Sequence, residues 1–262
     1  MTNRQSKSPL KGRPRRNPGQ SVDEEIQRII TGDTIEAALM MMIPAMFALF
    51  EWLKWWLELP PRPIILTAAA AIGIAIGAWR IFRIRIRLRS LRQGRDGEMA
   101  VGQFLERLRE HGYQVFHDVI GEGFNVDHVL VGPAGVFTVE TKTYSKRRTG
   151  ESVVRATPDS LRIGELDTGT RIYRQCVAQA QWIRRILKES TGRTFHVQPT
   201  LVFPGWMVSG QGSDDVWVTN PRLLPGALKQ RKVVNSPEDT KLASYHLSRH
   251  IRTSLDAVAN AL

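Results

Sequence analysis

The sequence has only one cysteine among its 262 residues, Cys176. A disulfide within the chain is therefore excluded, and no cluster of Cys and His has the spacing of a zinc site. Cys176 falls in a stretch with helical apolar periodicity, which favours a core position over a nucleophilic one. The six histidines are scattered. We expect His128 to point away from the face that carries its neighbour Asp127, so its role is structural.

The chain also lacks a glycine-rich phosphate-binding loop, an internal repeat and a run of coiled-coil heptads. These absences argue against a P-loop nucleotide site, a repeat solenoid and a long coiled coil. Negative charge is scarce, because 25 acidic residues stand against 37 Lys and Arg and leave a net charge of +12. A basic excess of this size favours partners that carry phosphate, namely nucleic acid, anionic lipid or both.

The N-terminal residues have no apolar core of the kind that a signal peptide needs. Residues 1–20 are rich in Lys, Arg and Pro, which predicts a disordered basic tail. Ser21 and Glu24 form a capping-box pattern that opens a short helix towards Ile30. We therefore expect residues 1–33 to form a basic tail and a short helix.

Two strongly apolar segments follow, at residues 35–53 and 64–82. Their lengths are near the lower end of the range of about 17 to 25 residues that crosses a bilayer. Tryptophans of the kind found at membrane interfaces lie near their ends, and the proline-rich residues 60–63 separate them. We predict a transmembrane helical hairpin within residues 34–90. A buried pair of soluble helices and a re-entrant hairpin are the alternatives.

Positive charge flanks the two apolar segments on one side. The tail before the first segment, residues 1–20, has six Lys or Arg, and seven arginines lie between residues 80 and 95, whereas the connector carries few. The positive-inside rule then places both termini and the following domain in the cytoplasm, as a multi-pass protein of the inner (cell) membrane. We expect the arginines after the second segment to bind the headgroups of the lipid bilayer, nucleic acid or both.

The pattern of helices and strands expected in residues 91–262 predicts a soluble α/β domain with a mixed sheet. Asp96 is placed to cap its first helix, and Gly112 to end it. A basic loop at residues 146–148 is expected either to touch DNA or to be solvated. The expected helices are 96–111, 171–188 and 237–261, and the expected strands are 113–119, 126–131, 136–142, 152–156, 198–203 and 216–218.

Two carboxylates and a lysine meet on a hairpin in the middle of this domain. Apolar runs flank the turn residues 132–135, and pairing Val131 with Val136 places Asp127 opposite Glu140. Side chains directly opposite one another have Cβ atoms about 5 Å apart, so two bare carboxylates there repel each other unless a proton or cation lies between them. Lys142 points to the same face as Glu140.

This arrangement has an ordinary interpretation, a salt bridge between Glu140 and Lys142 on a solvated strand face. The Val- and Phe-rich surroundings favour a buried hairpin instead, in which charged side chains are costly unless they bind something. A divalent cation such as Mg²⁺ or Mn²⁺ fits, because a couple of carboxylates plus water and phosphate oxygens satisfy it. Lys142 is then placed to orient an attacking water or to neutralise charge at phosphorus.

Residues 97–98 (Gly-Glu) and the run Gly-Phe-Asn-Val-Asp-His-Val-Leu-Val-Gly-Pro-Ala-Gly-Val-Phe-Thr-Val-Glu-Thr-Lys at residues 123–142 resemble the nuclease-related domain (NERD) family. The resemblance covers roughly residues 95–205. That family is placed in the PD-(D/E)xK nuclease superfamily, so the resemblance implies a restriction-endonuclease-like core, αβββαβ with a mixed sheet, preceded here by two transmembrane helices.

The resemblance also implies roles for individual residues. It makes Asp127 and Glu140 the metal-binding carboxylates, Lys142 the catalytic lysine, Glu98 the family's helical glutamate and Gln179 its downstream helical glutamine. Two departures from the family pattern are visible: Val126 replaces the proline before Asp127, and residues 175–176 are Gln-Cys where Asn-Pro is common.

Together these features predict a membrane-anchored, metal-dependent nuclease with little sequence specificity. The resemblance favours DNA as its substrate, and a homodimer is a further expectation because such nucleases often pair to cut both strands. The alternatives are a non-catalytic nucleic-acid-binding or sensing module that anchors a complex at the membrane, and a membrane scaffold that uses only the hairpin and the arginines.

Overall fold

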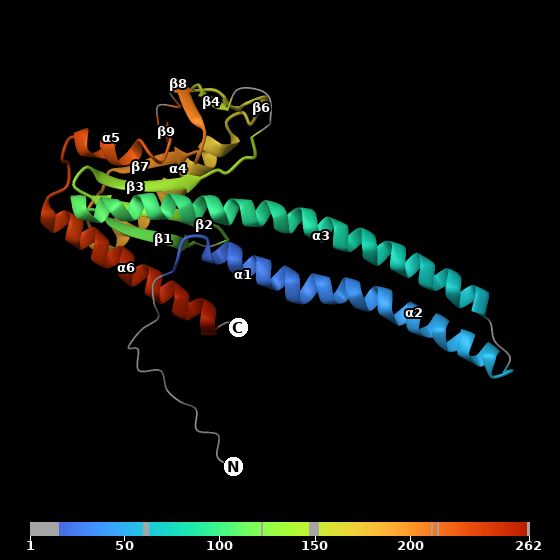
Figure 1. Cartoon of the computed structure of the whole chain (residues 1–262). Helices are drawn as coiled ribbons and strands as arrows, with labels where there is room; N and C mark the ends of the chain where they lie inside the picture. Colours follow the sequence, from blue (N-terminus) through green and yellow to red (C-terminus); the bar gives the residue numbers. More distant parts are fainter. Residues whose placement is uncertain are drawn as a thin grey trace, which may run out of the picture. The chain divides into compact units, whose positions relative to one another are not determined.

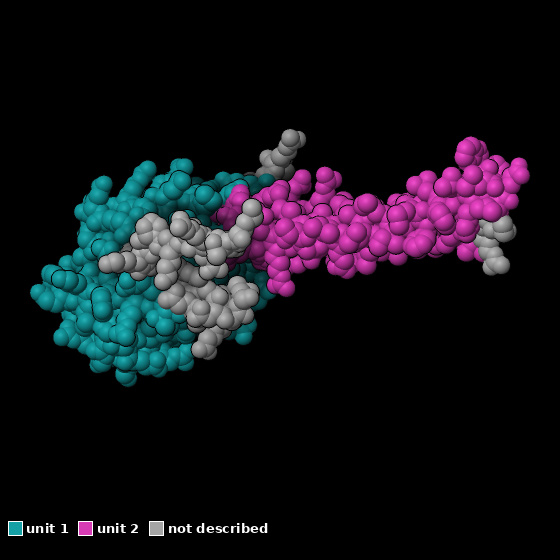
Figure 2. Space-filling model, turned by 90° about the horizontal axis from the view of Figure 1, so that it is seen from below, with its two compact units in different colours: residues 1–20, 96–262 teal, residues 21–95 magenta. Residues whose placement is uncertain are grey.

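The computed structural model describes residues 16–59, 63–121, 123–146, 152–210, 212–213 and 215–260 of a chain that forms two compact units. One unit contains residues 1–20 and 96–262, and the other contains residues 21–95 (Figure 2). Three expected features lie wholly or mainly outside the described residues: the basic tail, the proline-rich connector and the basic loop.

The unit formed by residues 21–95 is a helical hairpin. Its first arm contains most of α1 (Gln20–Arg28), a π-helical turn (Ile29–Asp33) and α2 (Thr34–Trp56), and its second arm is the first part of α3 (Pro63–Glu106) (Figure 1). Glycines let the arms approach closely, because a Cβ on Gly77 would lie 2.3 Å from Met41 Cγ. Close approach of this kind is common where apolar helices pack together.

Three of the seven arginines of α3 pair with acidic residues on the other arm. Arg80 binds Glu36 at 3.0 Å, Arg87 binds Glu25 at 2.6 Å and Arg95 binds Asp23 at 2.8 Å. The stretch of alternating Arg and Ile is helical, as predicted. Most of these paired side chains are half-exposed, so each ion pair contributes little to stability, but the series aligns the two arms.

Both arms carry long apolar surfaces. By length and composition, two helical stretches are long and apolar enough to cross a membrane, and only 11% of the most apolar window of each is buried. Large side chains exposed along them include Met42, Leu49, Ile65, Ile72 and Phe82. A surface of this kind is far more apolar than the scattered exposed hydrophobic residues of an ordinary soluble protein.

Helix α3 differs from the prediction at Asp96. We expected a new helix to begin there, but α3 runs unbroken to Glu106 and continues as a 3-10 turn (Arg107–His111). The Ile, Leu and Arg residues before Asp96 are helix formers, and a glycine inside a helix costs only about 1 kcal/mol relative to Ala, so nothing interrupts the helix. The predicted end is confirmed, because Gly112 caps it with a φ of 81°.

The other unit is built on two sheets (Figure 1). The five-stranded sheet has the order β1-β2-β3-β7-β9, in which β1, β2 and β3 are antiparallel neighbours and β7 and β9 run parallel to β3. Its strands are β1 (Gln114–Ile120), β2 (Asn125–Gly132), β3 (Gly135–Thr141), β7 (Val197–Val202) and β9 (Trp217–Thr219). The four-stranded sheet, of order β6-β5-β4-β8, contains β4 (Val153–Ala156), β5 (Leu161–Ile163), β6 (Leu166–Asp167) and β8 (Met207–Gly210).

Helices cover both faces of the five-stranded sheet. Val129, Val131 and Val136 pack against α4 (Arg171–Thr191) and α6 (Pro237–Asn260) on one face. Leu130 and Phe137 pack on the other face, against the end of α3 and against α5 (Leu224–Gln230). The β2–β3 hairpin is therefore buried on both sides, which explains its nearly continuous apolar sequence.

The predicted α/β class with a mixed sheet is confirmed. Each predicted strand lies within one residue of an observed strand at both ends, and the predicted long helices at 171–188 and 237–261 correspond to α4 and α6. Four short elements are not predicted from the sequence: β5, β6, β8 and α5. These elements have only 3, 2, 4 and 7 residues, too few to show a clear hydrophobic period.

Candidate active site

The predicted register of the β2–β3 hairpin is confirmed. Strand pairing runs from Gly132 and Gly135 at the turn to His128 and Val139. One residue beyond this ladder, Asp127 Oδ2 accepts a hydrogen bond from the backbone N–H of Thr141 at 2.7 Å. The hairpin thereby holds Asp127 against the end of β3, beside Glu140.

Three side chains fix the carboxylate of Glu140, which is only 4% exposed. Lys142 Nζ donates to Oε1 at 2.6 Å, and Gln175 Nε2 donates to the same oxygen at 2.8 Å. Gln179 Nε2 donates to Oε2 at 2.7 Å. A buried carboxylate needs such partners, and three donors, one just after β3 and two on α4, leave it a single orientation.

The pKa of Asp127 lies well above its usual value. Burial is the main cause, and the negative charges of Glu140 and Glu98 add to it, while the hydrogen bond from Thr141 acts in the opposite direction. Mutual repulsion between neighbouring carboxylates is relieved by a proton or by a cation. Asp127 and Glu140 are thus electrostatic neighbours, as the hairpin register predicts.

Glu98 joins the same group from helix α3. Its pKa rises to about 7, first because it is buried and then because Asp118 and Glu140 are negative; Lys142 lowers it in part. A close contact positions this part of α3, because a Cβ on Gly97 would lie 1.8 Å from Thr143 Oγ1. The structure therefore brings together all five residues predicted for the site: Glu98, Asp127, Glu140, Lys142 and Gln179.

Lys142 is the cation of this group. Burial lowers its pKa, but the charge of Glu140 and the hydrogen bond to it outweigh burial and raise the pKa overall. The ammonium is therefore charged at neutral pH, with its side chain 26% exposed. Across the described ranges, no three side chains of His, Cys, Asp or Glu are arranged to hold a metal ion by themselves.

A second group of polar residues lies at the site and is not predicted from the sequence. Gln175 binds Glu140 from one helical turn before Gln179, and this spacing of four along a helix was the available signal. Asp118, buried on β1, accepts from Arg16 Nε at 2.5 Å and from Asn125 Nδ2 at 3.3 Å. Asn125 in turn accepts a bond from Gln179 through its backbone oxygen. No sequence pattern joins Arg16 to residues a hundred positions away.

Two histidines lie behind the carboxylates in a polar chain. His128 is fully buried, and its Nδ1 atom lies 2.9 Å from the Nδ1 atom of His117. The other ring nitrogen of His117, Nε2, lies 2.7 Å from Glu106 Oε1. His128 Nε2 has no hydrogen-bond partner among the described residues. The structural role predicted for His128 is consistent with this position, turned away from the face of Asp127.

Acid should destabilise the domain through these histidines. Burial lowers the pKa of His128 well below its usual value, with a further contribution from His117, and burial also lowers the pKa of His117 although Glu106 opposes it. As the pH falls, these histidines therefore take up protons at a higher pH in the unfolded chain than in the folded one. The free energy of unfolding decreases below about pH 6.5, by up to about 1.4 kcal/mol per pH unit for each histidine.

Denaturant unfolding at about pH 7.5 and about pH 5.5, followed by tryptophan fluorescence, measures this loss. His128→Leu should show a smaller pH dependence than the wild type. His196→Gln, which alters an exposed histidine, should keep the full dependence. An unfolding free energy that is the same at both pH values in the wild type would contradict the assignment.

Cys176 lies on the buried side of α4 near this site. Burial raises the pKa of its thiol, and the charge of Glu140 raises it further. A thiol is a poor nucleophile when its pKa is raised, because the thiolate is the reactive form. The predicted core role of Cys176 agrees with this environment.

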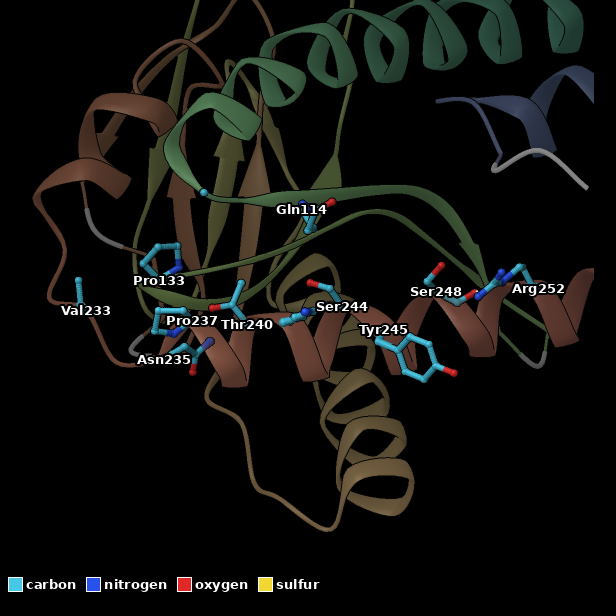
Figure 3. Close-up of a pocket in the computed structure, with 12 residues that line it drawn as sticks. Gln114, Pro133, Val233, Asn235, Pro237, Thr240, Ser244, Tyr245, Ser248 and Arg252 are labelled. Carbon is cyan, nitrogen blue, oxygen red and sulfur yellow. The ribbon is translucent and has the colours of Figure 1, made fainter. Parts of the chain in front are cut away.

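Two cavities differ in their relation to the carboxylates. One of about 420 Å³ is lined by Gln175 and Gln179 and therefore adjoins Glu140. A larger one of about 740 Å³ lies between β1 and α6, where Gln114 faces Thr240 and Ser244 (Figure 3). The predicted site residues do not line this larger cavity, so its volume says nothing about their chemistry.

Residues 93–204 match the model of the nuclease-related domain (NERD) family, a range that contains all five predicted site residues and Gln175. A segment of 57 residues is 37% identical to an uncharacterized protein of Bacillus anthracis, and it covers 20% of this chain and 27% of that protein. The match thus spans about a quarter of the relative's length. No solved structure matches the chain. On this match, residues 93–204 of the protein are similar to the nuclease-related domain of the NERD family.

Proposed function

We propose that this protein is a membrane-anchored, metal-dependent nuclease that hydrolyses phosphodiester bonds in DNA with little sequence specificity. The observation that carries the proposal is the environment of Glu140. It is a buried carboxylate fixed by Lys142, Gln175 and Gln179 and placed beside a second carboxylate, Asp127. A structural salt bridge needs the lysine, but it has no need for a second, repelling carboxylate.

A divalent cation fits this donor set. Asp127 and Glu140 would hold Mg²⁺ or Mn²⁺, which are satisfied by one or two carboxylates when water and phosphate oxygens complete the coordination. The raised pKa values of Asp127 and Glu98 mark excess negative charge that a cation offsets. When bound, the ion would act as a Lewis acid towards the phosphate and make a water molecule more acidic.

The protein residues supply orientation and charge. Lys142 is cationic, partly exposed and 2.6 Å from Glu140, so it can position the attacking water and stabilise negative charge that develops on phosphate. Gln175 and Gln179 prevent rotation of the Glu140 carboxylate. Fixed geometry of this kind contributes to rate because the reacting groups need no reorganisation.

The order of elements supports a restriction-endonuclease-like core of the PD-(D/E)xK superfamily. A helix bearing Glu98 precedes three antiparallel strands, and Asp127 lies on the second strand and Glu140 on the third. Helix α4 and the parallel strand β7 follow, after the small sheet formed by β4, β5 and β6. This is the αβββαβ sequence with one insertion.

Nucleic acid is the substrate that the charge of the protein favours. The net charge is +12, and α4 presents exposed cations on the helix that also carries Gln175 and Gln179: Arg174, Arg184, Arg185 and Lys188. Contacts between such side chains and phosphates carry no base information and weaken as salt rises. We therefore expect cleavage with little sequence preference and a steep dependence on ionic strength.

Membrane anchoring, with both termini in the cytoplasm, rests on the two apolar helices and the flanking arginines. The full chain should sediment with cell membranes and resist an alkaline wash. Ile72→Asp with Ile76→Asp should release it, because each charge near a helix centre costs about 3 kcal/mol on insertion. Leu223→Asp, at an exposed leucine of the other unit, serves as the control. Wild-type protein that appears mainly in the soluble fraction would overturn the anchor.

Cleavage of plasmid and linear DNA by the full chain in detergent tests the activity. Mg²⁺ or Mn²⁺ should support cleavage, and EDTA should abolish it, as should Asp127→Ala. Cleavage that persists in EDTA or in Asp127→Ala would exclude the proposed site. Binding of DNA without cleavage under every condition would favour the non-catalytic module instead.

A further inference from the structure

A cavity beside the candidate site has the composition of a base-binding pocket. It measures about 420 Å³, within the usual size of ligand sites, and six of its seven lining residues come from successive turns of α4. The seventh, Phe124, belongs to the connection between β1 and β2, three residues before Asp127. We call this cavity the α4 pocket.

The wall of the α4 pocket is aromatic. The ring of Phe124 lies 5.1 Å from that of Trp182, centroid to centroid, at an interplanar angle of 77°. Trp182 is buried and also packs against His250 of α6, whereas Phe124 is 37% exposed. One ring is therefore supported by the core and the other is accessible to a ligand. Flat, accessible aromatic rings of this kind are the surfaces on which nucleobases stack.

Polar groups surround the aromatic pair. Gln175, Gln181 and Arg185 are exposed at the rim. Gln179 lies deeper, only 2% exposed, and its Oε1 has no hydrogen-bond partner among the described residues. A buried acceptor without a partner is unfavourable, and a donor from a ligand in the pocket would satisfy it. An aromatic wall with a few amide groups and one guanidinium suits a planar, polar-edged ring near a phosphate.

The same glutamines join the α4 pocket to the candidate active site. Gln175 and Gln179 line the pocket and also donate to the two oxygens of Glu140. A nucleotide whose base occupies the pocket therefore brings its sugar-phosphate backbone towards the carboxylates. Among the described residues that line the larger cavity near α6, Tyr245 is the single aromatic one.

We propose that the α4 pocket binds an unstacked nucleobase, so that the substrate is single-stranded DNA or an unpaired segment of a duplex. This inference rests on the proposed nuclease function and names its substrate class. Bases in an intact duplex are stacked on both faces, and they reach an aromatic pocket only after unpairing. A strand that is already single makes the contact without that penalty.

Binding measured without metal tests the proposal separately from cleavage. The probe is a fluorescent oligothymidylate of about 12 nucleotides, within the site size of single-strand binders, and its anisotropy is followed with the full chain in detergent and EDTA. Phe124→Leu should weaken single-strand binding about 5- to 150-fold, the range for loss of one stacked base. Affinity for a duplex of equal length should change less than about twofold, because phosphate contacts remain.

Three controls separate stacking from general damage. Phe124→Trp should restore single-strand affinity, and Tyr245→Leu, at an exposed aromatic on α6, should leave it unchanged. An oligonucleotide with abasic residues should bind the wild type as weakly as Phe124→Leu binds oligothymidylate. If Phe124→Leu does not fold, Gln181→Ala, at an exposed and uncharged rim position, replaces it and should also weaken single-strand binding selectively.

The outcomes distinguish this proposal from the proposed function. Equal weakening of single- and double-stranded binding, or unchanged single-strand affinity in Phe124→Leu, would overturn the α4 pocket while leaving metal-dependent cleavage intact. If Phe124→Leu selectively loses single-strand binding while the wild type never cleaves DNA, the pocket is supported and the nuclease is refuted. Wild-type affinity for the abasic probe that equals its affinity for oligothymidylate would also exclude base stacking.

Discussion

Glu140→Gln should lower the single-turnover rate of DNA cleavage by about 10³-fold, the order of effect seen when one preorganised electrostatic group is removed from an active site. Glutamine keeps the shape of the side chain but removes its charge, and with it the affinity for a cation. The amide of the variant also places an NH₂ group among donors that bind the carboxylate oxygens in the wild type: Lys142, Gln175 and Gln179. At least one donor is then left without an acceptor.

Glu189→Gln is the matched control for this loss. Glu189 lies on the same helix as Gln175 and Gln179 but is exposed near the helix end, so the same change of charge should leave the rate within about twofold. Circular dichroism shows whether each variant is folded. A folded Glu140→Gln protein that retains more than about a tenth of the wild-type rate would remove Glu140 from the reaction.

Gly97→Ala should lower the cleavage rate about 10- to 100-fold, because small displacements of a positioned group have effects of this size. A Cβ at residue 97 would lie 1.8 Å from Thr143 Oγ1 and 2.9 Å from Thr143 Cβ. The whole threonine side chain obstructs it, so α3 or the end of β3 must move. Either movement separates Glu98 on α3 from Lys142, the residue before Thr143. Overpacking of this kind also destabilises by about 1 to 3 kcal/mol.

Gly94→Ala, one turn earlier on the same helix, distinguishes crowding from helix propensity. A Cβ on Gly94 meets nothing within 4 Å, so alanine there should stabilise the helix by up to about 1 kcal/mol and leave cleavage unchanged. Gly97→Ala combined with Thr143→Gly should recover part of the lost rate. Equal rates for the two single variants would show that the close contact has no role in positioning the site.

The hairpin was the part of the molecule most accessible to sequence reasoning. Its register follows from local pairing across a short turn, so counting from Val131 and Val136 correctly gives the pairs as far as His128 and Val139. Asp127 lies one residue further and binds the end of β3. Long amphipathic helices such as α4 were also predictable, because their period repeats over many residues. Glu98 and Gln179 depended on the family resemblance, and the structure places both near Glu140.

The remaining features depend on contacts between distant parts of the chain. The ion pair of Arg16 with Asp118 joins residues about a hundred positions apart, and no local pattern encodes it. Gln175 stands where the family often has another residue, yet its place one turn before Gln179 brings it to Glu140. The helix start predicted at Asp96 is wrong for a different reason. A capping residue does not begin a new helix when the sequence before it also forms helix without a break.

The central claim is that Asp127 and Glu140 form a divalent-cation site. Titration of the full chain with Mn²⁺, followed by electron paramagnetic resonance, tests it without any assumption about substrate. We expect Asp127→Asn to weaken Mn²⁺ binding by at least about 10-fold relative to the wild type. Glu140→Gln should do the same, whereas Glu189→Gln should bind as the wild type does. Equal Mn²⁺ affinity in all four proteins would contradict the account.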